Sequence, residues 1–441
     1  LFMKKLFCLV FCFFSVLSCS ILYSNNLNLK DIPKLNSYKT TLKNGLTLIV
    51  SEDHTVPNVS MQVWVKAGSA YEGDLSGSGI SHIVEHMLFE SNSSFGKGDL
   101  AKEISSLGGS VNAYTTLEHT VFYVDMKGND YKKGLKLLKK SLFESKINKK
   151  DFEQEKLIIS YEIMRGKDTV FQRMHKNFLE LVYGEHPYSY PVIGYQDCLL
   201  SLTTKQAQDY YKKMYVPNNM IISISGNVYE DDVEKYVKEI FGNEPRKALS
   251  PAIKYDIPDL IGKKVSESYD KDVSLSHLIF GYRVCGYENF DFLKLNIISM
   301  MLGEGKSSIL YRGLKYNKNL VNSISSYYYP SGCSGLFGIF VKYDSKDKQE
   351  ILTKINQNID KIKNKQFSED DFAASKQKII SDFIFKIERL KDRADIFAYS
   401  ERYFRDINYY KYFISCISNI TSQEIADCAK KYFNKENLCE V

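Results

Sequence analysis

Two histidines and a glutamate fall within five residues, His82-Ile83-Val84-Glu85-His86, and could hold a metal ion together with a water molecule. Apolar neighbours at helical spacing favour a helix, in which His82 and His86 lie on one face. Two neutral imidazoles on one face can share a zinc ion, which takes three or four ligands. Glu85 would then reach a water on the metal without binding the metal itself. An ordinary helix with one buried histidine and a solvated glutamate also fits these five residues.

A third ligand must come from another element. Residues 151–166 are predicted to form a helix with Asp151 as its N-cap. Glu155 and Glu162 are seven residues apart in this helix and therefore lie on one side of it. Glu153 is a further candidate, and spacing alone does not choose among the three carboxylates. Each of them could also be a simple solvated residue, as most helical glutamates are.

The elements around these residues predict an α+β fold. Residues 38–42 and 46–50 are predicted to pair as a hairpin around Lys43-Asn44-Gly45. Residues 59–65 and 120–126 alternate in polarity as strands do, whereas residues 131–142 have helical spacing. We therefore expect a mostly antiparallel sheet with helices packed on one face.

The second half of the chain resembles the first. Residues 213–220 are similar to residues 431–438 at an offset of 218, and His86-Met87-Leu88 aligns with Met300-Met301-Leu302 at a slightly smaller offset. This alignment places Asn296 and Ser299 at the positions of His82 and Glu85, so only the first copy keeps metal ligands. The repeat length suits two similar domains.

These patterns predict four segments along the chain. We expect a signal peptide at 1–24, a metal-bearing N-terminal domain at 30–241, a linker at 242–260 with several glycines and prolines, and a C-terminal domain of similar fold without metal ligands at 261–441.

Composition is that of a globular protein. Of 441 residues, 44% are hydrophobic and 25% are charged. The net charge of +6 comes from 59 basic and 53 acidic residues spread along the chain, with no basic patch interleaved with aromatic residues. Nucleic acid is therefore excluded as an expected partner.

The N-terminal residues have the pattern of an export signal. Lys4 and Lys5 precede an apolar run from Leu6 to Leu17, which is too short to span a bilayer comfortably, and small residues follow it. Cleavage after Ser20 or Ser24 fits this pattern, and so does a lipid anchor on Cys19. The expected location is a bacterial periplasm.

Six cysteines follow this segment, and they are scattered without a C-x-x-C pair. Neither a disulfide scaffold nor a thiolate zinc site is expected from them. We expect buried small side chains, some of which an oxidising compartment could pair. They are Cys198, Cys285, Cys333, Cys416, Cys428 and Cys439.

Longer motifs surround the candidate ligands. The chain resembles the pitrilysin (insulinase) family of zinc metallopeptidases, in the branch of the mitochondrial processing peptidase, whose members carry the inverted zincin order H-x-x-E-H. The resemblance extends from about residue 38 to residue 441. It is carried by Gly68-Ser69-Ala70-Tyr71-Glu72, by residues 79–89, by Gly108-Gly109-Ser110-Val111-Asn112-Ala113-Tyr114-Thr115 as G-G-x-x-N-A-x-T, by the spacing of Glu155 and Glu162, and by His186-Pro187 and Gly194.

The resemblance implies a role for each matching residue. His82, His86 and Glu162 would hold one Zn²⁺ per chain. Glu85 would be the general base that takes a proton from the zinc-bound water. Glu155 would orient a histidine ligand.

The resemblance also implies a substrate edge. Asn112 and Ala113, on a sheet edge, would pair with the substrate backbone as an added strand. On local chemistry alone, Asn112 equally fits a turn residue after the double glycine.

One part of the family pattern is missing. Family members often carry an Arg and, seven residues later, a Tyr that grip the substrate, and these positions are Lys315 and Asn322 in this chain. Lysine lacks the bidentate fork of arginine, and asparagine is too short to replace a phenol. A heterodimer whose sister chain supplies the missing grip is therefore expected. The rival expectation is a homodimer that uses Lys315 or Arg312.

The resemblance thus implies a zinc-dependent endopeptidase acting on short or unfolded peptides, with two domains that face each other across a chamber. The alternative is a non-catalytic homologue that binds peptides or scaffolds a complex.

Overall fold

The computed structural model describes residues 34–90, 96, 98–249, 257, 263–270 and 273–441. The predicted signal peptide, Cys19 and much of the predicted linker therefore lie outside the described residues.

The first half of the chain forms a six-stranded sheet. Its order is β1-β2-β6-β3-β5-β4, and every neighbouring pair is antiparallel except β2 and β6. β4 lies at one edge of this sheet. The strands are β1 (Asn36–Thr41), β2 (Thr47–Glu52), β3 (Asn58–Val65), β4 (Ser110–Thr115), β5 (Thr120–Lys127) and β6 (Met220–Gly226).

Most helices of the first half lie on one face of this sheet. Apolar residues of the strands alternate with the pleat, and one set, including Leu48, Val50 and Val63, packs under the helices. The helices are α2 (Ile80–Glu90), α3 (Asp99–Ser106), α4 (Tyr131–Phe143), α5 (Lys149–Lys167), α6 (Val170–Tyr183), α7 (Gln196–Ser201), α8 (Thr204–Met214) and α9 (Glu230–Phe241).

Helix α5 begins earlier than the sequence suggested. Asn148 is its N-cap, and the Asn148 side chain accepts a hydrogen bond from the backbone N–H of Asp151 at 2.9 Å. The prediction that Asp151 is the N-cap was wrong, because asparagine at position 148 provides the cap one turn earlier.

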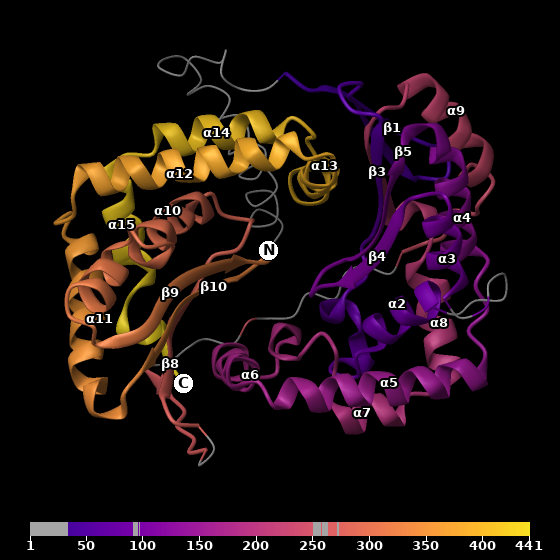
Figure 1. The fold of residues 1–441 in the computed structure, drawn as a ribbon. Coiled ribbons are helices and arrows are strands. Elements are labelled where there is room, and N and C mark those ends of the chain that lie inside the picture. The colour runs from indigo at the N-terminus through magenta and orange to yellow at the C-terminus, as the bar shows by residue number, and fades with distance from the viewer. Residues whose placement is uncertain (1–33, 91–95, 97, 250–256, 258–262, 271–272) are drawn as a thin grey trace, which may run out of the picture.

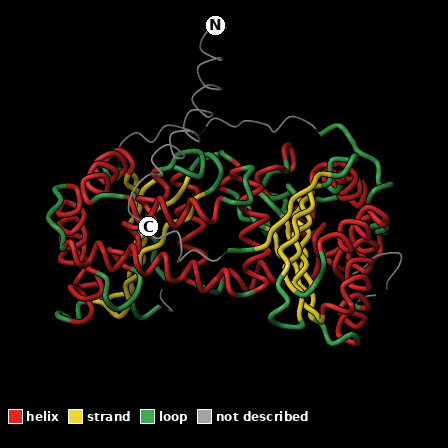
Figure 2. The backbone as a smooth tube through the Cα atoms, turned by 90° about the horizontal axis from the view of Figure 1, so that it is seen from above, coloured by secondary structure: helices red, strands yellow, loops and turns green. Residues whose placement is uncertain are grey.

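The second half contains a five-stranded sheet in the order β7-β11-β8-β10-β9, with only β11 and β7 parallel. Its strands are β7 (Lys264–Val265), β8 (Ser276–Val284), β9 (Val321–Pro330), β10 (Gly335–Tyr343) and β11 (Leu438–Glu440), and its helices are α10 (Asp291–Gly303), α11 (Lys348–Lys363), α12 (Glu369–Glu388), α13 (Leu390–Phe404), α14 (Tyr409–Asn419) and α15 (Ser422–Tyr432). Figure 2 shows the strands of the two halves as separate groups, each flanked by helices. The predicted α+β class with two similar domains is confirmed.

The repeat inferred from the sequence is visible in matching elements. Helices α8 and α15 both begin with a capping box, formed by Thr203 with Gln206 and by Thr421 with Glu424. Each helix is followed by a 3-10 turn and a strand, β6 or β11.

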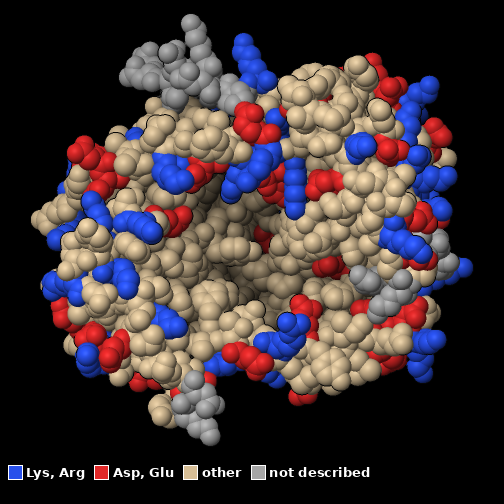
Figure 3. All heavy atoms as spheres, viewed as in Figure 1, with Lys and Arg blue, Asp and Glu red and all other residues tan. Residues whose placement is uncertain are grey.

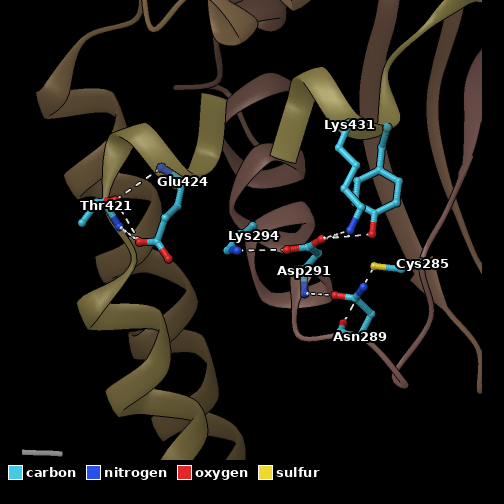
Figure 4. A network of polar contacts seen from close by, with 8 residues as sticks. Cys285, Asn289, Asp291, Lys294, Thr421, Glu424 and Lys431 are labelled. Carbon is cyan, nitrogen blue, oxygen red and sulfur yellow. Dashed lines mark hydrogen bonds and ion pairs between the residues drawn. The ribbon is translucent and has the colours of Figure 1, made fainter. Parts of the chain in front are cut away.

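Helix α10 is the helix that the sequence repeat aligns with α2. Asp291, in its first turn, accepts hydrogen bonds from Lys431 at 2.6 Å and Tyr432 at 3.0 Å, and Lys294 lies 2.9 Å from its other oxygen (Figure 4). These contacts hold the start of α10 against α15.

The two halves exchange one helix each. Helix α13 of the second half packs on β3 and β6 of the first sheet, and α6 of the first half packs on β8 and β11 of the second. In Figure 1, α13 and α6 lie between the halves at opposite ends of the space that separates them. The face of the first sheet that packs against α13 accordingly belongs to the hydrophobic core of the second half. Its residues in that core include Ile49, Trp64, Val121 and Ile221.

Polar contacts strengthen this exchange. Arg393 of α13 reaches Asp53 of the first half at 2.7 Å, and Ser223 of β6 donates to the carbonyl of Ala394 at 2.7 Å. Glu118 of the first half accepts hydrogen bonds from Tyr403 of α13 and from the Gly332 backbone.

The cysteines differ from the expectation. Cys198 and Cys333 are exposed, and only Cys428 and Cys439 are buried. All six are free thiols, so the prediction that they are uniformly buried was wrong. Within the described residues, no helix combines the length and the apolar character that a membrane crossing requires.

Candidate metal centre

Helix α2 carries the two histidines beneath the first sheet. Ile80, Ile83, Val84, Met87 and Leu88 are fully buried, and this apolar face fixes how the helix lies against its neighbours. His82 and His86 occupy a partly exposed face between β4 and α5, both of which contact α2. The buried stripe thus aims both imidazoles at the same space.

The start of α2 is held by a buried carboxylate. Glu72 Oε1 accepts a hydrogen bond from the backbone N–H of Ser81 at 3.0 Å, and Ser81 Oγ lies 2.8 Å from the Tyr210 hydroxyl. The first N–H groups of a helix have no intrahelical partner, and a glutamate oxygen satisfies one of them here, although burial raises the pKa of Glu72 to about 8. Glu72 therefore sets the position of the residue directly before His82.

Two glycines hold a loop against this helix start. Gly79 and Gly194 both have positive φ angles, +71° and +84°. A Cβ on Gly79 would lie 2.2 Å from the Ile193 carbonyl oxygen, and one on Gly194 would lie 2.5 Å from the Ser78 carbonyl carbon. Only glycine allows this approach, which brings Val192 and Ile193 to the wall of the site.

His82, His86 and Glu162 converge from two helices. Each offers one ligand atom, and these atoms all lie within 4.8 Å of one another. The imidazole centroids are 4.6 Å apart. Glu162 comes from α5 and is exposed, whereas Glu153 of the same helix pairs with Lys156. The structure therefore separates the carboxylates that sequence spacing left open.

The donor set fits a zinc ion. Two imidazoles and one carboxylate, with a position left for water, are typical of catalytic zinc. His82 Nδ1 is buried and has no hydrogen-bond partner within the described part of the chain. Burial, together with neighbouring His86, lowers the pKa of His82 to about 3, so this imidazole is neutral, as a metal ligand must be.

Glu155 supports the second histidine. Its Oε2 lies 3.3 Å from His86 Nδ1, and its side chain is almost fully buried. Burial alone would lower the pKa of His86, but the contact with Glu155 and the charges of Glu85 and Glu162 outweigh it and raise the pKa. The carboxylate thus holds one nitrogen of His86 and leaves the other for a metal.

Glu85 lies beside these ligand atoms on α2. Its Oε2 accepts a 2.6 Å hydrogen bond from Thr115 Oγ1 of β4. Burial raises the pKa of Glu85, and the Thr115 hydrogen bond and His86 oppose the rise. Glu85 is thus a restrained carboxylate with a raised proton affinity.

Asn112 and Ala113 lie in β4, the edge strand beside the histidines. The prediction of a sheet edge agrees with the strand order, and the rival interpretation of Asn112 as a turn residue does not. Asn112 Oδ1 accepts a hydrogen bond from the backbone N–H of Ala113 at 2.8 Å. This N–H is therefore held by a side chain that can rotate away.

A cavity of about 490 Å³ brings these residues together, and all of its lining residues come from the first half. Lys315 is partly buried and Asn322 is exposed, and neither is among the lining residues. Arg312 pairs with Asp371 at 2.6 Å. Within the described residues, the second half thus adds no cation to this cavity.

Several residues of the site escaped the sequence interpretation. Thr115 was noted only as the end of a motif, and Glu72 as part of another, although each holds a residue of α2. Val192 and Ile193 line the cavity without any chemical signature. Their only signal was the nearby Gly194.

Comparison with known proteins agrees with this arrangement. Residues 47–195 match the insulinase family, peptidase family M16, and residues 201–379 match the domain described as the peptidase M16 inactive domain. An uncharacterized zinc protease of Rickettsia felis is 26% identical over 405 residues, which cover 91% of this chain and 96% of that protein. The zinc protease PqqE of Helicobacter pylori is 27% identical over 374 residues, which cover 83% of each chain.

Solved structures show the same fold. A protease from Helicobacter pylori superposes with a TM-score of 0.85 at 22% identity, covering 93% of this chain and 99% of that one. The periplasmic protease PqqL from Escherichia coli has a TM-score of 0.77 at 16% identity, over 93% of this chain and 48% of that one. With both halves matched and the ligand cluster in place, this chain belongs to the pitrilysin, or insulinase, family of peptidases, family M16.

Proposed function

We propose that this chain is a zinc-dependent endopeptidase that hydrolyses short or unfolded peptides. The observation that carries the proposal is the convergence of His82, His86 and Glu162 beside the buried carboxylate of Glu85. Similarity to proteins described as zinc proteases supports it.

Each residue has a part in this reaction. His82, His86 and Glu162 would hold the zinc ion, which when bound supplies Lewis-acid polarisation of a water molecule and of the scissile carbonyl. Thr115 holds Glu85 Oε2, so we assign the proton of the attacking water to Oε1. Glu85 then delivers this proton to the leaving amine, for which its raised pKa is suited.

The edge strand β4 would orient the peptide. An extended peptide that pairs with β4 takes the Ala113 N–H from the Asn112 side chain and gains main-chain hydrogen bonds without regard to sequence. Only an unfolded segment has a free backbone of this kind, which accounts for the proposed substrate class.

The test separates metal binding from turnover. Glu85→Gln should keep one zinc per chain, measured by elemental analysis, and lose turnover of a quenched fluorescent peptide by about 10²- to 10⁴-fold. Glu162→Gln should lose zinc as well. Glu153→Gln, on the same helix but paired with Lys156, should keep both zinc and activity. Equal turnover by wild type and Glu85→Gln would overturn the proposal.

The same experiment decides the alternative function. A non-catalytic peptide-binding or scaffold homologue would bind peptides and show no turnover in wild type. The coexistence of three ligands with Glu85 and its Thr115 contact favours the enzyme, because binding alone requires no restrained base beside the ligands.

A second chain is part of the proposal. Among the described residues, none from the second half lines the metal cavity, and Arg312 is engaged with Asp371. We therefore propose that a partner chain supplies the substrate grip, as a heterodimer with a sister chain or as a homodimer. Turnover at full rate by a chain that light scattering shows to be monomeric would remove the support for a partner.

Export to a bacterial periplasm is the proposed location, supported by the charged and apolar pattern of residues 1–24. Mass spectrometry of the protein from membrane and periplasmic fractions would identify the mature N-terminus. A lipid on Cys19 would show an anchored form, and an unprocessed cytoplasmic chain would refute export.

A further inference from the structure

Two adjoining cavities border α13. Among the described residues, the first is lined by side chains of the second half, and the second lies between the halves. One has a volume of about 290 Å³ and the other about 230 Å³. They share Tyr287, Pro330, Asp395 and Tyr399 as lining residues. Figure 3 shows that the molecule is hollowed between its halves, with a wall that is mostly neither acidic nor basic and a few acidic side chains inside.

Asp395 of α13 is the carboxylate that both cavities share. Its Oδ1 accepts a hydrogen bond from the Tyr114 hydroxyl at 3.1 Å. In the described part of the chain, no lysine or arginine nitrogen pairs with Asp395 within 4 Å, whereas Asp53 and Asp291 each have such a partner. Burial is the main reason that the pKa of Asp395 rises to about 6. The structure thus holds a withdrawn carboxylate without a counter-ion.

The charged residues near Asp395 do not serve as its counter-ion. Lys391 stands over the Tyr123 ring at 3.7 Å, and Asp392 pairs with Arg389. Lys386 lines the larger cavity from α12 but is exposed, and it acts on Asp395 only from a distance. An exposed cation at the rim can be displaced by one that the cavity itself encloses.

Tyrosine rings form the wall around Asp395. Tyr287 and Tyr399 stand with centroids 5.1 Å apart, and Tyr403 lies 4.7 Å from each of them. Aromatic faces attract cations, and the attraction grows when water is excluded. A carboxylate enclosed by tyrosine rings is therefore suited to an ammonium or guanidinium group.

The larger cavity is also related to the metal centre by the repeat. Asn296 of α10 lines it, and the sequence repeat aligns Asn296 with His82 of the first half. At the aligned place the second half thus has a recess lined largely by aromatic side chains in place of metal ligands.

Tyr114 connects the smaller cavity to the metal cavity, because its side chain borders both. Its neighbour Thr115 points the other way, to Glu85 on α2. Side chains of a peptide paired with β4 would alternate in the same manner between the α2 side and the α13 side. Every second side chain would therefore face the α13 side, on which Asp395 lies.

We propose that Asp395, with Tyr114, Tyr287 and Tyr399, forms a cation subsite for a lysine or arginine side chain of the bound peptide. This inference rests on the proposed binding of peptides along β4. The subsite gives a preference for basic residues at a fixed distance from the cleaved bond, and it uses the second half of the chain for selection rather than for chemistry.

The test uses the full chain loaded with zinc in a Glu85→Gln background, so that binding is measured without cleavage. Labelled peptides carry one lysine that is moved along the sequence, and each is compared with its norleucine counterpart by fluorescence anisotropy. At one or two positions, lysine should bind roughly tenfold more tightly than norleucine. N-terminal acetylation distinguishes a terminal ammonium from a lysine side chain in the same cavity.

Variants then assign the preference to Asp395. Asp395→Asn keeps an acceptor for the Tyr114 hydroxyl but removes the charge, and it should make the lysine and norleucine peptides bind alike. Lys386→Ala should enlarge the preference for lysine. Asp427→Asn changes an exposed carboxylate on α15, and it should leave the preference intact.

A direct probe separates this inference from the proposed function. n-Butylammonium, followed by the shift in melting temperature, should stabilise wild type more than Asp395→Asn, whether or not the protein cleaves peptides. Absent turnover with this difference retained would refute the peptidase and keep the subsite. Equal binding of lysine and norleucine peptides at every position, or an equal loss for both in Asp395→Asn, would overturn the subsite.

Discussion

Replacing Arg393 tests how the halves are held together. Arg393 Nη1 lies 2.7 Å from Asp53 Oδ2, and Nε donates to the Ile387 carbonyl at 2.8 Å. The side chains of Arg393 and Asp53 are only 5% and 14% exposed. Arg393→Leu leaves a carboxylate without its charge partner in a place that water reaches poorly, and we expect a loss of about 3–5 kcal/mol in the free energy of unfolding.

The double mutant shows whether the pair itself is responsible. Asp53→Asn removes the carboxylate charge, so Asp53→Asn/Arg393→Leu should be more stable than the sum of the single losses predicts, by about 1–3 kcal/mol. The single tryptophan of the chain, Trp64, lies on the sheet face against which α13 packs, so its fluorescence during urea unfolding reports on this contact.

The control is the exposed ion pair of Lys205 with Asp209 on α8. Lys205→Ala should cost less than about 1 kcal/mol. Additive single losses, or a cost for Arg393→Leu as small as that of Lys205→Ala, would refute the role assigned to the buried pair.

Acid should weaken the same contact. Burial by itself would raise the pKa of Asp53, but hydrogen bonds from Thr55 and the charge of Arg393 lower it on balance. A carboxyl group with a lowered pKa stabilises the fold above its ordinary pKa and loses this effect as the pH falls through the lowered value. Wild type should therefore lose more stability below about pH 4 than the double mutant.

Three further predictions follow from single residues. Glu155→Gln should lower zinc affinity about 10- to 100-fold in chelator competition, because His86 loses its carboxylate partner, and unchanged affinity would contradict this role. Gly194→Ala should destabilise the fold by more than about 2 kcal/mol in urea titrations, because Gly194 has a positive φ and an added Cβ would lie 2.5 Å from the Ser78 carbonyl carbon. Gly108 also has a positive φ but has open space around it, so Gly108→Ala should cost about 1–2 kcal/mol. Burial and two nearby arginines lower the pKa of Lys66 to about 8. The free energy of unfolding of wild type should therefore rise between pH 8 and pH 10, and that of Lys66→Met should not, so parallel pH curves for the two proteins would refute this.

The cluster of candidate metal ligands could be predicted from the sequence because its chemistry is rare and local. His82 and His86 are a helical pair, and Glu162 followed from the family spacing. The hairpin at Asn44-Gly45, the edge strand at Asn112 and the repeat near residue 431 were visible for a similar reason, since turn residues and alternation leave a mark over a few positions.

Contacts between residues far apart in the sequence have no such local pattern. Arg393 and Asp53 are ordinary surface residue types, and nothing in either local sequence indicates that they meet across 340 positions. In the sequence, Asp395 is one of several acidic residues in a charged helix. Its lack of a counter-ion becomes visible only when α13 is placed on the first sheet. The N-cap of α5 was misplaced because Asn148 and Asp151 are both good caps and only the folded backbone chooses between them.

The exchange of α6 and α13 means that the two halves are interlocked rather than merely adjacent. A swing that separated them would strip each helix from the other's sheet and expose Ile49, Trp64, Val121 and Ile221 to water. The chain should therefore behave mechanically as one rigid half-shell. A peptide would then enter through the open side of that half-shell. A partner chain covering this side, and not a hinge within the chain, would control its entry.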